Sequence, residues 1–160
     1  MIQLPEEVKR AFEHPETQKV LTTVSKESMP HTVFKGSLSV FDDATIAYME
    51  FLETCQTQRN MLHSIWFKKI VAVSIFNPVM NVAYQIKGEP YKHIFTGPVW
   101  DEYLGRVRNS MPDVSPAGVW LITVKEVRNE DFQIRLKEED KRRPGTEYWL
   151  KYIETRREEK

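Results

Sequence analysis

The 160-residue sequence predicts an α+β protein that is mainly β and is built on an antiparallel β-barrel. Two stretches, residues 31–41 and 81–95, alternate apolar and polar side chains, which is typical of strands with one buried face. Short turns separate the expected strands, and helical periodicity is confined to a few segments. No internal repeat or linker divides the chain, so residues 1–160 are expected to form a single domain.

The N-terminal third predicts one helix and a three-stranded meander. Residues 4–14 have helical apolar spacing, and residues 19–25, 31–41 and 45–51 are expected to be strands joined by turns. Residues 31–41 divide into an apolar and a polar face, which comprise Phe34, Gly36, Leu38 and Val40, and Lys35, Ser37 and Ser39, respectively.

The middle of the chain predicts a helix and a buried strand. The helix follows LETCQTQRNML, runs to about Trp66 and is expected to dock through Leu62, Ile65 and Trp66, which have i, i+3, i+4 spacing. Residues 69–76 (KIVAVSIF) are apolar on both faces and therefore predict a central strand.

The C-terminal part predicts two more strands and a second helix between them. Residues 81–95 form a long alternating strand, the segment after Gly97-Pro98 reads as a helix, and residues 117–127 are expected to be a last buried strand. Residues 137–160 form a highly charged tail, with a helix expected from Thr146. The two faces of the long strand are Val82, Tyr84 and Ile86, and Ala83, Gln85 and Lys87.

Composition excludes several classes of protein. The formal net charge is zero, with 23 basic and 23 acidic residues, so neither a nucleic acid nor a membrane surface is an expected partner. A single cysteine cannot form an internal disulfide and suits a reducing compartment. The N-terminus lacks a signal-peptide pattern and no apolar stretch approaches the ~20 residues that span a bilayer, so the expected location is the cytoplasm.

The familiar catalytic and metal-binding motifs are absent. There is no phosphate-binding loop, dinucleotide fingerprint, nucleophile elbow or CxxC pair, and the four histidines lack metal-ligand spacing, so no metal site is predicted. Cys55 has no histidine close in sequence and is expected to be a structural thiol. No catalytic acid or base can be assigned. Lys35 and Lys87 are interpreted as residues that adjust the electrostatics of a binding site, and not as acid–base catalysts.

The stretch LETCQTQRNML combines features of an anion site with those of an ordinary capped helix. Thr54 or Thr57 can cap the helix, whose first N–H groups attract negative charge. Arg59 lies near enough to lean over the same terminus and bind a phosphate. Capping threonines are common, so from this stretch alone a capped helix with a solvated arginine is the default explanation.

Polar side chains on the two alternating strands offer a second, weaker indication. Lys35 and Ser37 on one strand, and Gln85 and Lys87 on the other, project from the polar faces. These faces either meet water or, in a dimer, form a groove of amide and ammonium donors that suits the polar edge of a flavin or of another flat polar heterocycle.

The order of segments resembles the FMN-binding split-barrel family, which includes pyridoxamine 5′-phosphate oxidases and small FMN-binding proteins. The segments that carry it are KVLTTVSKESMPHTVFKGSLSV, TIAYMEF, TQRNML, IVAVSIF, YQIKGEP and GPVWDEY, over roughly residues 1–127. The resemblance implies a six-stranded antiparallel split barrel with flanking helices. It also implies a homodimer with FMN at the subunit interface, acting as an oxidoreductase of unknown substrate.

The resemblance also implies which residues hold the cofactor. The strand around residues 31–37 would run along the flavin ring, the segment 54–59 would hold the phosphate, and Gln85 would reach the ring or the ribityl chain. The implied cofactor-binding residues are Val33, Phe34, Lys35, Gly36, Ser37, Tyr48, Met49, Thr54, Gln56, Thr57, Arg59 and Gln85.

Two departures from the family pattern stand out. Gln56 occupies a position where relatives often have a lysine, and the tail has no histidine after Trp149, so pyridoxal phosphate synthesis is not expected. The alternatives are a non-enzymatic flavin carrier or sensor, a barrel that binds a deazaflavin or haem, and a cofactor-free dimeric interaction module. A haem ligand would come from His31, His63 or His93.

Overall fold

A computed structural model of the chain describes residues 2–143, 152, 154 and 156. The start of the helix expected from Thr146 lies outside the described residues, as does Trp149. Within the described residues no helix is long and apolar enough to span a bilayer.

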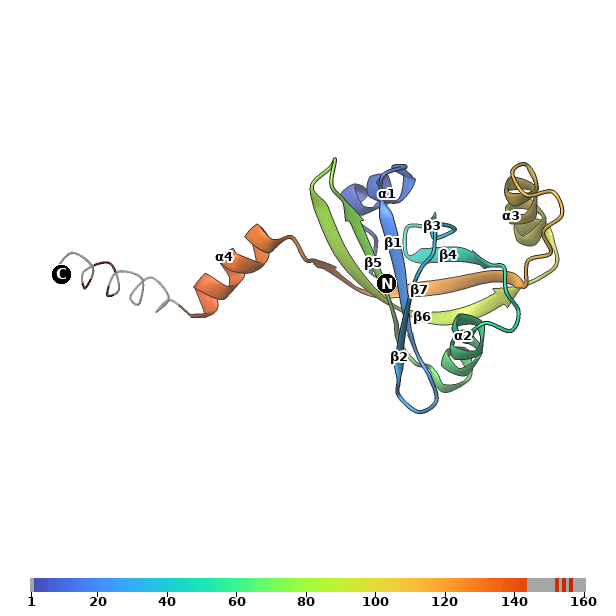
Figure 1. The fold of residues 1–160 in the computed structure, drawn as a ribbon, viewed down its shortest axis with the longest axis horizontal. Coiled ribbons are helices and arrows are strands. Elements are labelled where there is room, and N and C mark those ends of the chain that lie inside the picture. The colour runs from blue at the N-terminus through green and yellow to red at the C-terminus, as the bar shows by residue number, and fades with distance from the viewer. Residues whose placement is uncertain (1, 144–151, 153, 155, 157–160) are drawn as a thin grey trace.

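One antiparallel sheet and four helices make up the described part of the chain (Figure 1). The helices are α1 (Glu6–Glu13), α2 (Gln56–Phe67), α3 (Pro98–Arg108) and α4 (Phe132–Arg142). The strands are β1 (Gln18–Val24), β2 (Pro30–Phe34), β3 (Ser39–Asp42), β4 (Thr45–Glu50), β5 (Val71–Asn77), β6 (Val82–Ile94) and β7 (Gly118–Asn129). Their order in the sheet is β2-β1-β5-β6-β7-β4-β3. This confirms the mainly antiparallel β prediction with flanking helices.

The strand order requires the sheet to curl into a barrel. β2 and β3 lie at opposite ends of the seven-stranded order, yet the four residues 35–38 join them. A flat sheet of seven strands would separate its edges by about 29 Å, whereas a connection of this length reaches at most about 17 Å. The sheet must therefore bend until its two edges meet, and β2 and β3 remain unpaired with each other across the split.

The segment predicted as one strand over residues 31–41 is two strands. Lys35 O accepts a hydrogen bond from Leu38 N at 3.2 Å, which closes a β-turn and separates β2 from β3. Leu38 is buried whereas Phe34 is 74% exposed, so the predicted common face of these two residues is wrong. The expected meander is correct in its two neighbour pairings, β1 with β2 and β3 with β4, but wrong as a continuous three-stranded unit, because β2 and β3 lie at opposite ends of the strand order. The turn therefore gives seven strands where six were expected.

Two hydrophobic clusters fill the molecule on either side of β4 and β7. Ile46 and Tyr48 point into the barrel together with Trp120, whereas Ala47 and Met49 face a cluster that includes Tyr103 of α3. β4 is consequently buried along its whole length. Residues 69–76 were expected to be covered on both faces, but β5 buries one face only, and Phe76 of its other face is exposed.

Helix α2 docks on the barrel through a face that overlaps the predicted one only at Ile65, which packs against the core. Met61 lies in the core, but Leu62 is partly exposed and Trp66 is 81% exposed. The docking face is largely polar and is held by hydrogen bonds, with Trp120 Nε1 donating to Gln58 Oε1 at 2.7 Å. The apolar spacing misled the prediction because buried amide groups were not recognised as the docking face. Its other buried residues are Thr57, Asn60 and Ser64.

Candidate functional site

The N-terminus of α2 is capped by Cys55, and not by Thr54 or Thr57 as predicted. Cys55 has an extended backbone, and its Sγ accepts a hydrogen bond from Gln58 N at 3.3 Å. Thr57 is buried in the first turn of the helix, whereas Thr54 is exposed in the loop before it. Cys55 is therefore a half-buried structural thiol, as expected, and its role is that of the cap.

Arg59 leans back over this helix terminus, as the sequence predicted. Its Nη1 donates to Thr54 O at 2.8 Å and its Nη2 donates to Gln56 Oε1 at 2.9 Å. Both acceptors are neutral, so the positive charge of the guanidinium is held in place without being neutralised by them. A guanidinium has five N–H donors, and these two bonds leave most of that capacity for a ligand.

A chain of amide hydrogen bonds connects Arg59 to the sheet. Gln56 Nε2 donates to Asn60 Oδ1 at 2.7 Å, and Asn60 Nδ2 donates to Thr23 Oγ1 at 2.9 Å. Thr23 pairs with His31 of β2, so the chain ends beside the first half of that strand. Gln56 thus serves to orient Arg59.

A hollow of about 410 Å³ lies between α2 and the β1–β2 hairpin, and we call it the arginine hollow. Three basic side chains face it, and Glu27 is the acidic one, with a 3.5 Å contact to Lys26. Sequence reasoning missed Lys26 and His63 because they are remote from Arg59 along the chain or one turn beyond it. The lining residues are Ser25, Lys26, Glu27, Gln56, Arg59, Asn60 and His63.

Strand β2 runs along the edge of the sheet from the arginine hollow. Lys35 N donates to Lys19 O of β1, and antiparallel pairing alternates the direction of successive residues. The backbone N–H and C=O groups of Thr32 and Phe34 therefore point away from β1, out of the sheet edge. The five residues of β2 span about 16 Å and present donors and acceptors along the strand.

The far end of β2 is held by a buried ion pair. Lys35 Nζ lies 2.7 Å from Oε2 and 2.9 Å from Oε1 of Glu50, and the Glu50 side chain is only 1% exposed. Glu50 Oε1 also accepts hydrogen bonds from the backbone N–H groups of Phe51 and Leu52. The charge of Lys35 is thereby neutralised within the chain.

The other residues predicted along the ring fall into two groups. Phe34, Gly36 and Ser37 line a second hollow of about 520 Å³ with Lys35, Leu52 and Arg106, whereas Val33 is half-buried on the inner side of β2. Tyr48 and Met49 are interior residues of the two hydrophobic clusters. Burial and the nearby Glu50 carboxylate raise the pKa of Tyr48. Ser37 Oγ donates to Met49 O at 2.8 Å, which ties the turn to β4.

Gln85 lies apart from the other predicted residues. It occupies a row across the outer face of the sheet that runs from Phe34 through Val20 and Ser74. Three strand spacings separate Gln85 from Phe34, which is about 14 Å. A single copy of the chain therefore does not bring Gln85 to the edge strand. Lys87, on the same outer face, is paired with Glu126 at 3.1 Å.

The histidines are dispersed in the fold. His93 stacks on Trp120 with ring centroids 4.3 Å apart, and its buried Nε2 has no hydrogen-bond partner. A Cβ at Gly118 would lie 2.1 Å from this Nε2, so only glycine lets the ring pack there. Burial lowers the pKa of His93. The sequence contained no periodic signal for this stack.

Comparison with known proteins shows which solved structures share this fold. No protein-family model and no curated protein matches the sequence. Among solved structures, HupZ of Group A Streptococcus superposes with a TM-score of 0.65 at 18% identity, over 81% of this chain and 95% of that one.

Two further structures have the same architecture. An FMN-binding protein from Syntrophomonas wolfei gives a TM-score of 0.60 at 14% identity, covering 78% of this chain and 84% of the other. A candidate pyridoxamine 5′-phosphate oxidase from Lactobacillus delbrueckii gives 0.59 at 18% identity, covering 80% and 95%. The chain has the split-barrel fold of the pyridoxamine 5′-phosphate oxidase-like proteins, which confirms the resemblance at the level of fold.

Proposed function

We propose that this protein binds FMN along the β2 edge and acts as a flavin-dependent oxidoreductase. The observation that carries the proposal is Arg59, a guanidinium held by two neutral acceptors at the wall of a hollow that also has Lys26 and His63. A phosphate monoester is dianionic or nearly so, and it matches this set of donors. A solved structure of the same fold is described as an FMN-binding protein, which supports the choice of ligand.

The residues present fit the remaining parts of FMN. In the proposed complex the phosphate contacts Arg59 at the start of β2, and the flavin ring lies toward Phe34 at the other end. The outward N–H and C=O groups of Thr32 and Phe34 are the kind of donors and acceptors that pair with the polar edge of the ring. FMN, when bound, supplies hydride and electron transfer.

The side chains of this site bind and orient, and none of them is assigned a proton transfer. The Lys35–Glu50 pair anchors the turn that follows β2, which fixes the backbone beneath the proposed ring position. The exposed Phe34 side chain, beside the second hollow, provides an apolar surface that excludes water.

The proposed assembly is a homodimer in the cytoplasm. Gln85 is about 14 Å from Phe34 within one chain, so it contacts the same cofactor only if a second copy brings it there. The outer sheet face around Gln85 carries the exposed Phe34 and Phe76, which favours contact with another protein surface. The single free thiol is compatible with a reducing compartment.

The visible spectrum of the purified protein tests this proposal. We expect flavin absorption bands, or quenching of FMN fluorescence when FMN is added to the colourless protein. Riboflavin, which lacks the phosphate, should bind more weakly than FMN because it makes no contact with Arg59. A colourless protein that leaves FMN fluorescence unchanged would overturn the proposal.

A further inference from the structure

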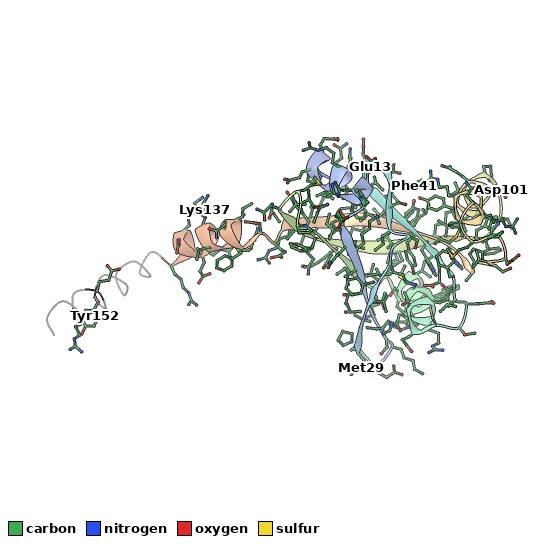
Figure 2. All side chains as sticks on the ribbon, turned by 45° about the horizontal axis from the view of Figure 1, so that its top comes forward. Glu13, Met29, Phe41, Asp101, Lys137 and Tyr152 are labelled. Atoms are coloured by element: carbon green, nitrogen blue, oxygen red, sulfur yellow. The ribbon has the colours of Figure 1, made fainter. Side chains whose placement is uncertain are left out.

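Helix α4 is a formed helix that makes little contact with the barrel of its own chain. Asp131 caps it, since its carboxylate accepts hydrogen bonds from Gln133 N and Ile134 N. None of the helix residues Phe132–Arg142 is buried, and the helix projects away from the barrel in two views (Figures 1 and 2). Isolated helices shorter than ~12–15 residues are marginal in water, so a helix of 11 residues needs a packing surface.

The helix carries an apolar face that is open to solvent. Phe132 and Leu136 are four residues apart and therefore lie on the same side of the helix. Phe132 is 70% exposed and Leu136 is 42% exposed. Lys141 follows Phe132 by nine residues, which places it on the opposite side of the helix, and it lies about 140° around the axis from Leu136. A face of this kind is typical of helices that dock on another surface.

A hollow on the outer face of the sheet begins at the foot of α4. Its volume is about 290 Å³, and its walls include Val20, the exposed Phe34 and Phe76, and Glu130. Glu130 precedes the first residue of α4 by two positions, so the hollow and the helix are neighbouring parts of one surface. Helix α4 leads away from the body (Figure 1), and no residue of α4 lines the hollow of its own chain.

The charges around this face suit contact with an identical copy. Lys87 pairs with Glu126 at 3.1 Å, and Arg128 pairs with Glu130 at 3.0 Å. A two-fold axis places each patch opposite itself, so unneutralised charge on the patch would repel its own copy. These self-paired charges avoid that repulsion, and the zero formal net charge of the chain removes the long-range part.

We propose that α4 is an arm that packs on a second copy of this chain, with its Phe132–Leu136 face against the partner's outer sheet face. Two-fold symmetry means that each copy gives one arm and receives one. The arm adds its own apolar area to a sheet-face contact, and a stable interface needs about 1,000 Å² or more of buried surface. This inference rests on the homodimer of the proposed function and specifies how its two copies are held together.

Isotope-resolved cross-linking tests whether the arm is exchanged. Unlabelled and ¹⁵N-labelled full-length chains are refolded together and treated with an amine-reactive cross-linker that reaches Lys137 and Lys141. Cross-links of mixed isotope composition between α4 and residues 2–130 support the proposal. Exclusively same-isotope cross-links mean that the arm folds back on its own chain, and no cross-links mean that it stays free. Either of these two results overturns the proposal.

A matched pair of variants tests the apolar face itself. Leu136→Gln should weaken the dimer at least tenfold in sedimentation equilibrium, because burial of a leucine stabilises a contact substantially. Lys141→Gln, on the opposite side of α4, should change it less than twofold. Equal effects would overturn the docking face. FMN fluorescence is measured on the same samples. An FMN-loaded dimer without mixed-isotope cross-links would overturn the proposal for α4 and leave the flavin proposal intact. A colourless dimer with mixed-isotope cross-links would overturn the flavin proposal and leave the proposal for α4 intact.

Discussion

Two cationic side chains lie at the two ends of β2, and they differ in burial and in the charge of their partners. Lys35 is half-buried and paired with the buried carboxylate of Glu50, whereas Arg59 is exposed and is held by a backbone carbonyl and an amide oxygen. The carboxylate of Glu50 neutralises the charge of Lys35. The acceptors of Arg59 are uncharged, so its positive charge can still attract an anionic ligand. The position of a cation near a proposed phosphate is therefore less informative than the charge of the groups that hold it.

Both lysines interpreted as electrostatic tuners are paired with glutamates in the structure. Lys35 contacts Glu50 and Lys87 contacts Glu126, but the first pair is buried and the second lies at the surface. The sequence contained no sign of either pair, since 15 residues separate the first and 39 the second. Any electrostatic effect of either lysine on a ligand would therefore come from a lysine–glutamate pair with no net charge.

The largest effect is expected from breaking the buried pair. Lys35→Met should lower the free energy of unfolding by about 3–5 kcal/mol, because it leaves the Glu50 carboxylate buried without its counter-charge. Chemical denaturation measures the change. Replacing both partners, in Lys35→Met/Glu50→Gln, should recover a large part of the loss.

Lys87→Met is the matched control for this prediction. Its partner Glu126 has a side chain that is 48% exposed, and surface pairs contribute about 0–1 kcal/mol. A similar loss in both single variants would contradict the distinction between the two pairs.

The next effect concerns the exposed cation. Arg59→Ala should weaken FMN binding about tenfold to a hundredfold, since hydrogen bonds to charged groups contribute about 1.5–3 kcal/mol. Riboflavin binding should be unchanged, and so should the free energy of unfolding to within about 0.5 kcal/mol. Fluorescence titration with both ligands measures the ratio. Arg10→Ala, an exposed arginine on α1, serves as the control, and equal losses for FMN and riboflavin would show that Arg59 does not hold the phosphate.

A smaller effect is expected from the residue that orients Arg59. Gln56→Ala removes one of the two acceptors of the guanidinium and the hydrogen bond to Asn60. FMN affinity should fall by about 0.5–1.5 kcal/mol, which is a few-fold to about tenfold, and less than for Arg59→Ala. The double variant tests the mechanism: if Gln56 acts through Arg59, Gln56→Ala has no further effect once Arg59 is alanine. Full additivity of the two losses in fluorescence titration would contradict a positioning role.

Periodicity predicted the elements well where one face of a strand or helix meets the core. β6 and β7 lie within a few residues of the expected segments 81–95 and 117–127, and α3 begins at Pro98 as the Gly97-Pro98 pair indicates. Periodicity could not predict which strands pair with each other. Alternation continued through residues 35–38, so only the partner strands reveal that β2 ends there and β3 begins.

The candidate site was predicted to a similar extent. Arg59 leans over the start of α2 as expected, because capping geometry is local in sequence. The cap itself was wrong, since a thiol acceptor at Cys55 was not weighed against two threonines. Asn60 and Lys26 were missed because their role depends on the β1–β2 hairpin, which lies about 30 residues away along the chain. Helix α4 was not predicted: its first half was left unassigned, and its second half was included in the charged tail of residues 137–160, where most side chains are polar.

The smallest predicted effect extends the comparison to a third basic group. His93 is half-buried like Lys35, but its Nε2 has no hydrogen-bond partner among the described residues, and burial lowers its pKa below the unfolded value. The unfolded chain therefore binds the proton more tightly, so stability should be lost as the pH falls from above about 6.5 through the folded pKa. One proton limits the contribution to less than about 1.4 kcal/mol per pH unit. His93→Phe retains an aromatic ring beside Trp120 and removes the titration, so its free energy of unfolding should decrease less than that of the wild type between pH 7.5 and 5.5, as measured by denaturation at both pH values. Parallel pH profiles for the two proteins would contradict the lowered pKa, because protonation of the half-buried imidazole would then not destabilise the fold.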